Sequence, residues 1–202
     1  MVPAPVTPGA RIAATPLVEA VVVGASAGGV KALQSILPRL SRCRVPILVV
    51  VHLPPRRKSL LSELFAPYCE GTVREPFDKE PVSPGVWFAA PDYHLMVERD
   101  RTFSLTRDAP VWFSRPSIDV LFESAAEAYG PALVAVVLTG ANADGAAGAR
   151  AVRDAGGTVA VEAPELAEVP TMPRAAIALA APQFVGSLDE VATFVCGRAE
   201  VS

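Results

Sequence analysis

The sequence contains few of the residues that mark metal proteins and disulfide-stabilised proteins. It has three cysteines and two histidines among 202 residues. Cys43, Cys69 and Cys196 lie far apart and form neither a CxxC pair nor a Cys/His pattern. Zinc ligands and disulfide frameworks need such spacings, so the sequence predicts no metal site and three reduced thiols.

An excess of basic charge and a long apolar run are also missing. The formal net charge is -3, whereas nucleic-acid-binding domains are usually basic, so we expect no nucleic-acid partner. No apolar run reaches the ~18 residues of a membrane span, which predicts no membrane insertion. The N-terminus lacks a charged segment followed by an apolar core, so no secretion signal is predicted and we expect a cytoplasmic protein.

What is present is typical of one globular domain with a buried sheet. Hydrophobic residues make up 51% of the chain and charged residues 19%. A chain of this length and composition can bury a sufficient core without a disulfide or metal. Residues 1–16 hold four prolines and several alanines and are predicted to form a flexible tail. A single folded domain is predicted to span residues 17–202.

Apolar runs alternate with helical patterns along most of the chain. The β-branched runs predict buried strands over residues 17–23, 46–52, 132–138 and 158–161. Helices are predicted over residues 29–40, 59–68, 117–129, 146–155, 173–180 and 188–196, with Ser117 as an N-cap. Short strands, some paired as a hairpin, are predicted within residues 82–91 and 93–106. This order predicts an α/β fold: a doubly wound three-layer α/β/α arrangement with a mainly parallel sheet and a short β-hairpin insertion.

Three reactive side chains stand where predicted strands end. Ser26 follows the first strand, His52 closes the second, and Asp144 lies shortly after the third. Parallel strands share one direction, so their carboxyl ends meet at one edge of the sheet, where ligands of open α/β sheets bind. Imidazole can remove the serine proton near neutral pH, and a carboxylate orients the ring. The pattern therefore predicts a Ser-His-Asp catalytic triad.

The loop around Ser26 matches G-x-S-x-G, the pattern of a sharp strand-to-helix turn that exposes a nucleophile. Backbone N–H groups at the start of the next helix could hold an oxyanion. The same loop could instead be an ordinary turn or a nucleotide-phosphate loop. Ser26 replaces the second glycine of the dinucleotide pattern, and the Gly-Lys-Ser/Thr of a Walker loop is missing, which weakens the nucleotide alternative.

Each remaining residue also has a structural interpretation. His52 could be a structural histidine, and Asp144 could be the N-cap of the helix that follows it, or a cap and a triad member together. For His94, a structural or pocket-lining role is favoured over catalysis. The basic run at residues 56–58 is interpreted as a solvated face that could also meet an acidic partner helix.

Six ordered blocks resemble the CheB-type protein-glutamate methylesterase domain, over roughly residues 18–195. They are Gly24-Ala25-Ser26-Ala27-Gly28-Gly29, Val51-His52-Leu53-Pro54-Pro55, Ala90-Pro91-Asp92-Tyr93-His94-Leu95, Arg115-Pro116-Ser117-Ile118-Asp119-Val120-Leu121-Phe122, residues 138–148 and Met172-Pro173-Arg174-Ala175-Ala176.

The resemblance implies hydrolysis of glutamate γ-methyl esters on the cytoplasmic helices of methyl-accepting chemoreceptors, releasing methanol, with deamidation of protein glutamines as a second activity. It places the family's catalytic residues on Ser26, His52 and Asp144. The backbone N–H groups near Ala27, Gly28 and Ala141 are candidate oxyanion donors, and the resemblance associates position 141 with the oxyanion site and places Met172 near it as a further oxyanion or substrate-binding position. The reaction is expected to need no metal and no cofactor. Most family members carry a receiver domain before this domain. Only about sixteen residues precede the core here, so we expect no phospho-regulation within the chain and, as one alternative, a separate regulator in trans.

Two loops depart from the family pattern. Ala27 stands where threonine is usual, and Gly140-Ala141-Asn142 stands where Gly-Met-Gly is usual. Two alternatives to methylesterase activity therefore stay open: a non-catalytic or regulatory chemosensory binding module that retains the fold, and an esterase that acts on a different acyl substrate.

Overall fold

A seven-stranded parallel sheet forms the middle layer of the structure, a computed structural model that describes residues 17–52 and 59–199. The strand order across the sheet is β3-β4-β2-β1-β7-β8-β9, and every pair of neighbours is parallel. The strands of this sheet are β1 (Ala20–Ala25), β2 (Pro46–Val51), β3 (Val73–Arg74), β4 (Gly85–Phe88), β7 (Leu133–Val137), β8 (Thr158–Glu162) and β9 (Phe184–Gly186).

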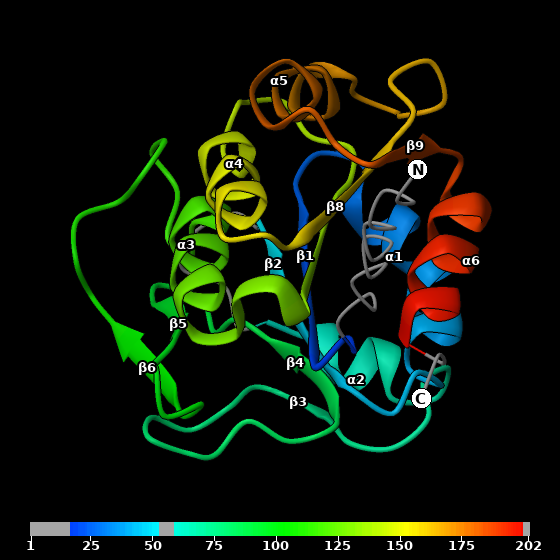
Figure 1. The fold of residues 1–202 in the computed structure, drawn as a ribbon. Helices are drawn as coiled ribbons and strands as arrows, with labels where there is room; N and C mark the ends of the chain where they lie inside the picture. The colour runs from blue at the N-terminus through cyan, green and yellow to red at the C-terminus, as the bar shows by residue number, and fades with distance from the viewer. Residues whose placement is uncertain (1–16, 53–58, 200–202) are drawn as a thin grey trace, which may run out of the picture.

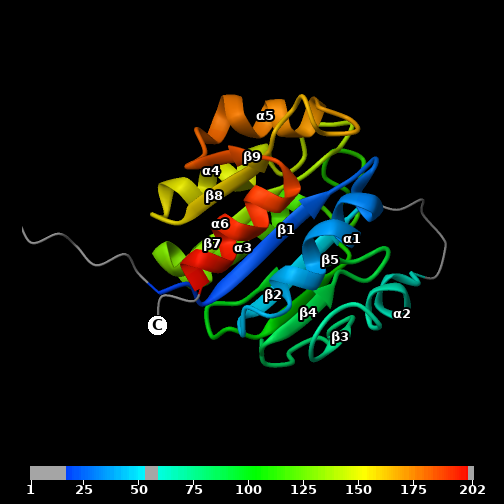
Figure 2. The same cartoon turned by 90° about the vertical axis from the view of Figure 1, so that its right-hand side faces the viewer.

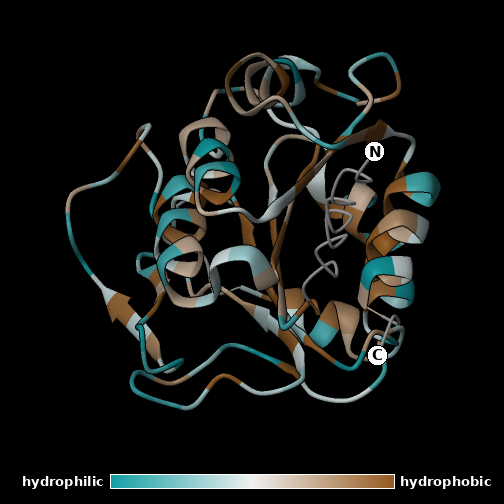
Figure 3. Cartoon of the chain, in the orientation of Figure 1, coloured by the Kyte–Doolittle hydropathy of each residue, from teal (hydrophilic) through white to brown (hydrophobic). Residues whose placement is uncertain are grey.

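Helices cover both faces of this sheet, as Figure 1 shows. On one face lie α3, α4 and α5, and on the other lie α1, α2 and α6. Figure 3 shows the hydrophobic colour concentrated on the sheet and on the helix sides that face it. The helices are α1 (Gly29–Leu40), α2 (Leu61–Phe65), α3 (Ile118–Tyr129), the 3₁₀ turn η1 (Gly130–Ala132), α4 (Ala146–Asp154), α5 (Thr171–Ala180) and α6 (Leu188–Ala199).

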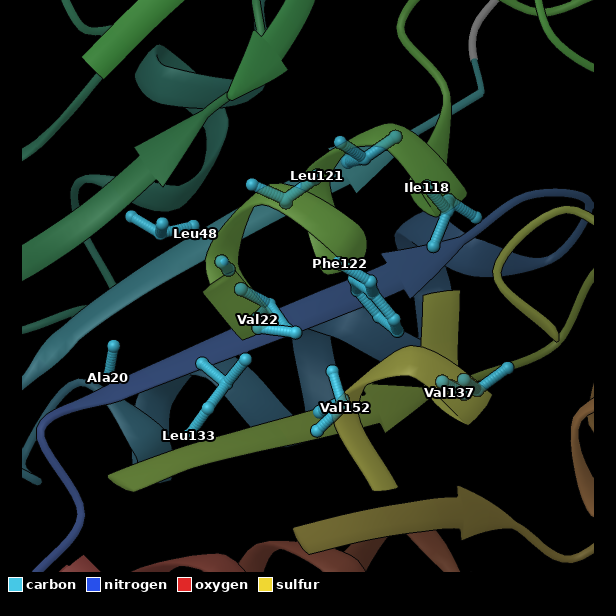
Figure 4. Packing of buried hydrophobic residues seen from close by; sticks show 14 of the residues in the cluster. Ala20, Val22, Leu48, Ile118, Leu121, Phe122, Leu133, Val137 and Val152 are labelled. Atoms are coloured by element: carbon cyan, nitrogen blue, oxygen red, sulfur yellow. The ribbon is translucent and has the colours of Figure 1, made fainter. Parts of the chain in front are cut away.

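The central strands are apolar along their whole length because both of their faces are covered. Every residue of β1 and of β2 is buried. Along β1, Ala20 and Val22 join the core beneath α3, whereas Val21 and Val23 join the core beneath α1 and α6. Figure 4 shows Phe122 of α3 among the apolar side chains on the first of these faces. This two-sided burial confirms the predicted doubly wound α/β fold.

The predicted hairpin is present outside the main sheet. Strands β5 (His94–Val97) and β6 (Phe103–Thr106) pair antiparallel, with His94 opposite Thr106. Leu95 and Phe103 are buried in the same core as α3. The hairpin therefore places His94 beside the beginning of that helix.

Some elements differ from the sequence prediction. The strands β3 and β9, of two and three residues, were not predicted because so short a run carries no readable period. Helix α2 covers Leu61–Phe65 rather than residues 59–68, because Pro67 has no backbone N–H with which to continue the hydrogen bonds of the helix. Within residues 17–52 and 59–199, no helix is long and apolar enough to cross a membrane.

The strand order brings three functional loops to the same edge. β1 lies between β2 and β7, so the segments that follow these three strands are neighbours. Figure 2 shows β1 and β4 running in the same direction. Beyond the strand ends, the N–H of His52 donates to the carbonyl of Ala25 at 3.1 Å, and the N–H of Ser26 donates to the carbonyl of Thr139 at 2.9 Å. Backbone hydrogen bonds thus join the ends of the three strands at the edge of the sheet where the predicted triad lies.

Candidate active site

His52 and Asp144 meet at the carboxyl edge of the sheet, although 92 positions separate them in the sequence. The Nε2 atom of His52 lies 2.8 Å from Oδ2 of Asp144. The Asp144 side chain is completely buried, and that of His52 is 11% exposed. A carboxylate accepts only, so Nε2 carries the proton and Nδ1 is the ring nitrogen left to act as a base.

Asp144 accepts hydrogen bonds on both of its oxygens from the beginning of α3. Oδ1 accepts from the hydroxyl of Ser117 at 2.8 Å and from the N–H of Asp119 at 2.9 Å, and Oδ2 accepts from the N–H of Ile118 at 2.8 Å. Burial raises the pKa of Asp144, but the hydrogen bonds from His52 and from the N–H groups of Asp119 and Ile118 outweigh it, so the net pKa is lowered. The carboxylate is therefore charged at neutral pH and can stabilise an imidazolium.

Asp144 does not cap the helix that follows it. The N-cap of α4 is Gly145, whose φ of 94° suits glycine. The helix whose first N–H groups donate to the Asp144 carboxylate is instead α3, with the predicted Ser117 as its N-cap. The local interpretation of Asp144 as an N-cap of its own helix was therefore wrong.

Ser26 lies between β1 and α1 and shares a pocket of about 350 Å³ with His52. Among the described residues, no hydrogen bond joins the Ser26 hydroxyl to the imidazole, a looseness common in sites without bound substrate. The pocket is lined by Ser26, Gly28, Gly29, Val30, Lys31, Gln34, Val51, His52 and Glu168.

The turn after Ser26 leaves backbone donors available. Gly28 has a φ of 78° and precedes α1 as its N-cap. A Cβ atom at this position would lie 2.8 Å from Cβ of Glu168, so only glycine fits without a shift. In the part of the chain that the structure describes, the N–H groups of Ala27, Gly28 and Ala141 donate to no protein acceptor. Of these three residues, Gly28 lines the pocket, and its N–H at the start of a helix suits an anionic oxygen.

Met172 is not among the residues that line the Ser26 pocket. Its side chain is fully buried and packs against Gly140, where an added Cβ would lie 2.5 Å from the methionine Cε. The N–H of Met172 donates to the carbonyl of Gly140 at 3.0 Å. Met172 thus supports the loop that leads to Asp144 from beneath.

Thr139 joins the loops around the site, a role that no local sequence pattern predicted. Its hydroxyl donates to the carbonyl of Ala27 at 2.8 Å and accepts from the N–H of Val169 at 2.8 Å. Its own N–H donates to the buried carboxylate of Glu162 at 2.7 Å. Burial raises the pKa of Glu162, and the Thr139 N–H opposes that shift. Together with the bond to the N–H of Ser26, these contacts hold the nucleophile loop against the aspartate loop.

Asp119 and His94 also lie behind the site. Oδ1 of Asp119 accepts from the N–H groups of Gly145 and Gly148 at 2.8 and 2.7 Å, and Oδ2 accepts from the indole of Trp112 at 3.1 Å. His94 is 1% exposed and accepts from the N–H of Ser117 at 3.2 Å. Both residues stand within blocks already noted in the sequence, but their partners lie 7 to 29 positions away.

The basic run at residues 56–58 lies outside the described residues. Within residues 17–52 and 59–199, no three histidine, cysteine, aspartate or glutamate side chains gather as metal ligands.

The fold and the site define a class: an α/β protein that places a serine, a histidine and a buried aspartate at the carboxyl edge of a parallel sheet. The model of the CheB methylesterase family matches residues 21–195. The chain belongs to this family.

Known proteins agree with this assignment. A putative protein-glutamate methylesterase/protein-glutamine glutaminase from Leptospira interrogans is 43% identical over 176 residues, which cover 86% of this chain and 91% of that protein. A protein-glutamate methylesterase/protein-glutamine glutaminase from Clostridium acetobutylicum is 33% identical over 94% of this chain and 57% of that protein. The crystal structure of the CheB methylesterase catalytic domain of Thermotoga maritima superposes with a TM-score of 0.83 at 34% identity, covering 89% of this chain and 98% of that one.

Proposed function

We propose that this chain is a protein-glutamate methylesterase that hydrolyses glutamate γ-methyl esters on the cytoplasmic helices of chemoreceptors. The observation that carries the proposal is the 2.8 Å contact between His52 and the buried Asp144, beside the pocket that Ser26 shares with His52. Membership of the CheB methylesterase family supplies the substrate class.

The first step is an attack by Ser26 on the ester. Nδ1 of His52, which does not face Asp144, takes the proton from the Ser26 hydroxyl as Oγ bonds to the ester carbonyl carbon. The carbonyl oxygen becomes an oxyanion, and the N–H groups of Ala27, Gly28 and Ala141 are the donors that we propose to stabilise it. Asp144 stabilises the imidazolium. Collapse of the intermediate breaks the bond to methoxide, which takes the proton from His52 and leaves as methanol.

The second step returns the enzyme. His52 removes a proton from water, which attacks the acyl carbon. The bond to Oγ breaks, and Ser26 takes the proton back from His52. The product is a glutamate carboxylate. No step uses a metal or an organic cofactor.

A glutaminase activity is a second candidate because the names of the Leptospira and Clostridium relatives include it. The same acyl chemistry would act on a glutamine side chain and release ammonia in place of methanol. Regulation by a separate protein and a cytoplasmic location stay predictions.

The test is methanol release from chemoreceptor membranes that a methyltransferase has labelled. We expect release by the wild-type protein and a loss of about 10⁶-fold in kcat for Ser26→Ala. Ser35→Ala is a matched control, because Ser35 is an exposed serine on α1 outside the Ser26 pocket. Near wild-type turnover by Ser26→Ala would exclude Ser26 as the nucleophile. No release by any variant would favour the binding-module alternative.

A further inference from the structure

We propose that His94 is a positioning residue for the reaction: its Nδ1 atom fixes the N-cap residue of α3 and thereby holds Asp144 against His52. This inference rests on the proposed function for its kinetic part. It extends that function to a residue outside the predicted triad.

The hydrogen bonds of His94 determine which ring nitrogen carries the proton. Nδ1 accepts from the backbone N–H of Ser117 at 3.2 Å, and Nε2 lies 3.2 Å from the carbonyl oxygen of Ala109. A backbone N–H can only donate and a carbonyl can only accept. His94 is therefore neutral, with its proton on Nε2 and its lone pair on Nδ1.

The next contact leads directly to the triad. Ser117 is fully buried, and its hydroxyl donates to Oδ1 of Asp144 at 2.8 Å. Oδ2 of the same carboxylate faces Nε2 of His52 at 2.8 Å. A continuous chain of hydrogen bonds thus runs from His94 through Ser117 and Asp144 to His52.

The beginning of α3 is where this chain of bonds can act on geometry. Among the described residues, three of the four donors to the Asp144 carboxylate come from the consecutive residues Ser117, Ile118 and Asp119. Nδ1 of His94 accepts from the first of these residues, at its backbone. A shift of Ser117 would move the donors together and turn the carboxylate away from His52. Small displacements of a catalytic group lower the rate strongly, so the acceptor on His94 should affect turnover more than binding.

Two substitutions distinguish the roles of the two ring nitrogens of His94. In His94→Asn, Oδ1 stands near the position of Nδ1 and keeps the acceptor for Ser117. In His94→Gln, the longer side chain keeps a polar group near Nε2 and Ala109 but loses that acceptor. We expect His94→Gln to lower kcat about 10- to 100-fold at an unchanged KM, and His94→Asn to keep most of the wild-type kcat. Equal losses, or the reverse order, would refute the proposal.

A matched control uses another hydrogen bond between the hairpin and α3. The hydroxyl of Ser124 accepts from the N–H of Val97 at 3.2 Å, with no contact to Asp144. Ser124→Ala should therefore leave kcat unchanged. Combining His94→Gln with Ser117→Ala should cost less than the sum of the two single losses, because both act on one carboxylate. Strict additivity would contradict a route through Ser117.

NMR tests the same proposal without any turnover. The chain has only two histidines, so ¹⁵N-labelled wild type and the His94→Gln variant suffice to assign both rings. We expect His94 to be protonated at Nε2 only, and the Nε2 proton of His52 to shift when His94 becomes glutamine. A His94 proton on Nδ1, or an unmoved His52 proton, would overturn the proposal. If no esterase activity is found, the proposed function fails while this measurement still decides the role of His94.

Discussion

Asp144 accepts hydrogen bonds at the start of α3, the helix that contains Asp119, and Asp119 accepts hydrogen bonds at the start of α4, the helix that Asp144 precedes. Asp144, just before α4, accepts from the N–H groups of Ile118 and Asp119 at the start of α3. Asp119, in the first turn of α3, accepts from the N–H groups of Gly145 and Gly148 at the start of α4. Both carboxylates are buried. Because each helix start holds the aspartate of the other, α3 and α4 position the triad carboxylate as a pair.

Removal of the Asp119 carboxylate should loosen both helix starts. Burial raises the pKa of Asp119, and so does the charge of Asp144, whereas the N–H of Gly148 lowers it. Asp119→Ala leaves the N–H groups of Gly145 and Gly148 without their acceptor, so we expect a loss of about 3 kcal/mol in the free energy of unfolding together with a lower kcat. Asp119→Asn keeps one oxygen and should lose less of both. Urea unfolding measures the first effect and methanol release the second. An Asp119→Ala variant as stable as the wild type would show that the Asp119 carboxylate does not hold the start of α4.

Asp144 should stabilise the fold in a pH-dependent way. Its pKa in the folded protein lies below the ordinary value of 3.8, so the folded state favours the charged form. This stabilisation is complete well above pH 3.8 and disappears as the pH falls through the lowered pKa. Urea unfolding should therefore show a gap in stability between wild type and Asp144→Asn at pH 7 that narrows near pH 3. Asp154→Asn, at an exposed ion pair with Arg150, serves as the control and should show a small effect. A difference in stability that widens as the pH falls would contradict a lowered pKa for Asp144.

The same Asp144→Asn variant should be slow but not inactive. The amide keeps the shape of the side chain but cannot stabilise the imidazolium, and in serine hydrolases such a change lowers kcat by about 10⁴. We therefore expect a smaller loss than for Ser26→Ala, measured as methanol release at saturating substrate. Equal losses in the two variants would indicate that Asp144 has a further role in the reaction.

The Thr139 hydroxyl should matter for the position of Ser26. Thr139→Val keeps the shape of the side chain but leaves the Ala27 carbonyl and the Val169 N–H without their partner. Each lost bond in a buried site costs about 1–3 kcal/mol, and a displaced nucleophile loop should lower kcat up to about 100-fold. Thr139→Ser retains the hydroxyl and should restore both values. If valine and serine variants behave alike, the hydroxyl does not position the loop.

Met172 should contribute to stability through packing beneath Gly140. Truncation of a fully buried methionine to alanine costs about 2–5 kcal/mol, and loss of support for the aspartate loop should lower kcat as well. Met172→Leu conserves volume and should cost less than about 1.5 kcal/mol. Leu179 lies on the same helix with 47% of its surface exposed, so Leu179→Ala is the surface control. Thermal and urea unfolding of the three variants would separate these outcomes.

Much of the fold could be predicted because its signals are local. The buried strands β1, β2 and β7 are apolar runs, and the strand-helix order implies a parallel sheet with both faces covered. The ends of these strands then predicted that Ser26, His52 and Asp144 would be close. Two short edge strands escaped prediction, since two or three residues show no period.

The supporting residues could not be predicted in the same way. His94, Thr139 and Asp119 are polar residues whose partners stand mostly more than 20 positions away. No local sequence pattern predicts such a contact, because the contact depends on how the hairpin, α3 and the loops after β7 pack together. Asp144 is an example. Its sequence neighbours predict that it caps α4, but its carboxylate instead accepts hydrogen bonds from the start of α3.

The sequence by itself determined the α/β alternation, the burial of the central strands and the choice of three reactive side chains at strand ends. These follow from hydrophobic periodicity and from the common direction of parallel strands, which are properties of short segments. Only the tertiary structure decided that Nε2 of His52 faces Asp144, that two helices exchange their capping carboxylates, and that His94 stands behind Ser117. Those relationships depend on buried polar groups that must find partners across the fold, and the packing of distant segments selects the partner.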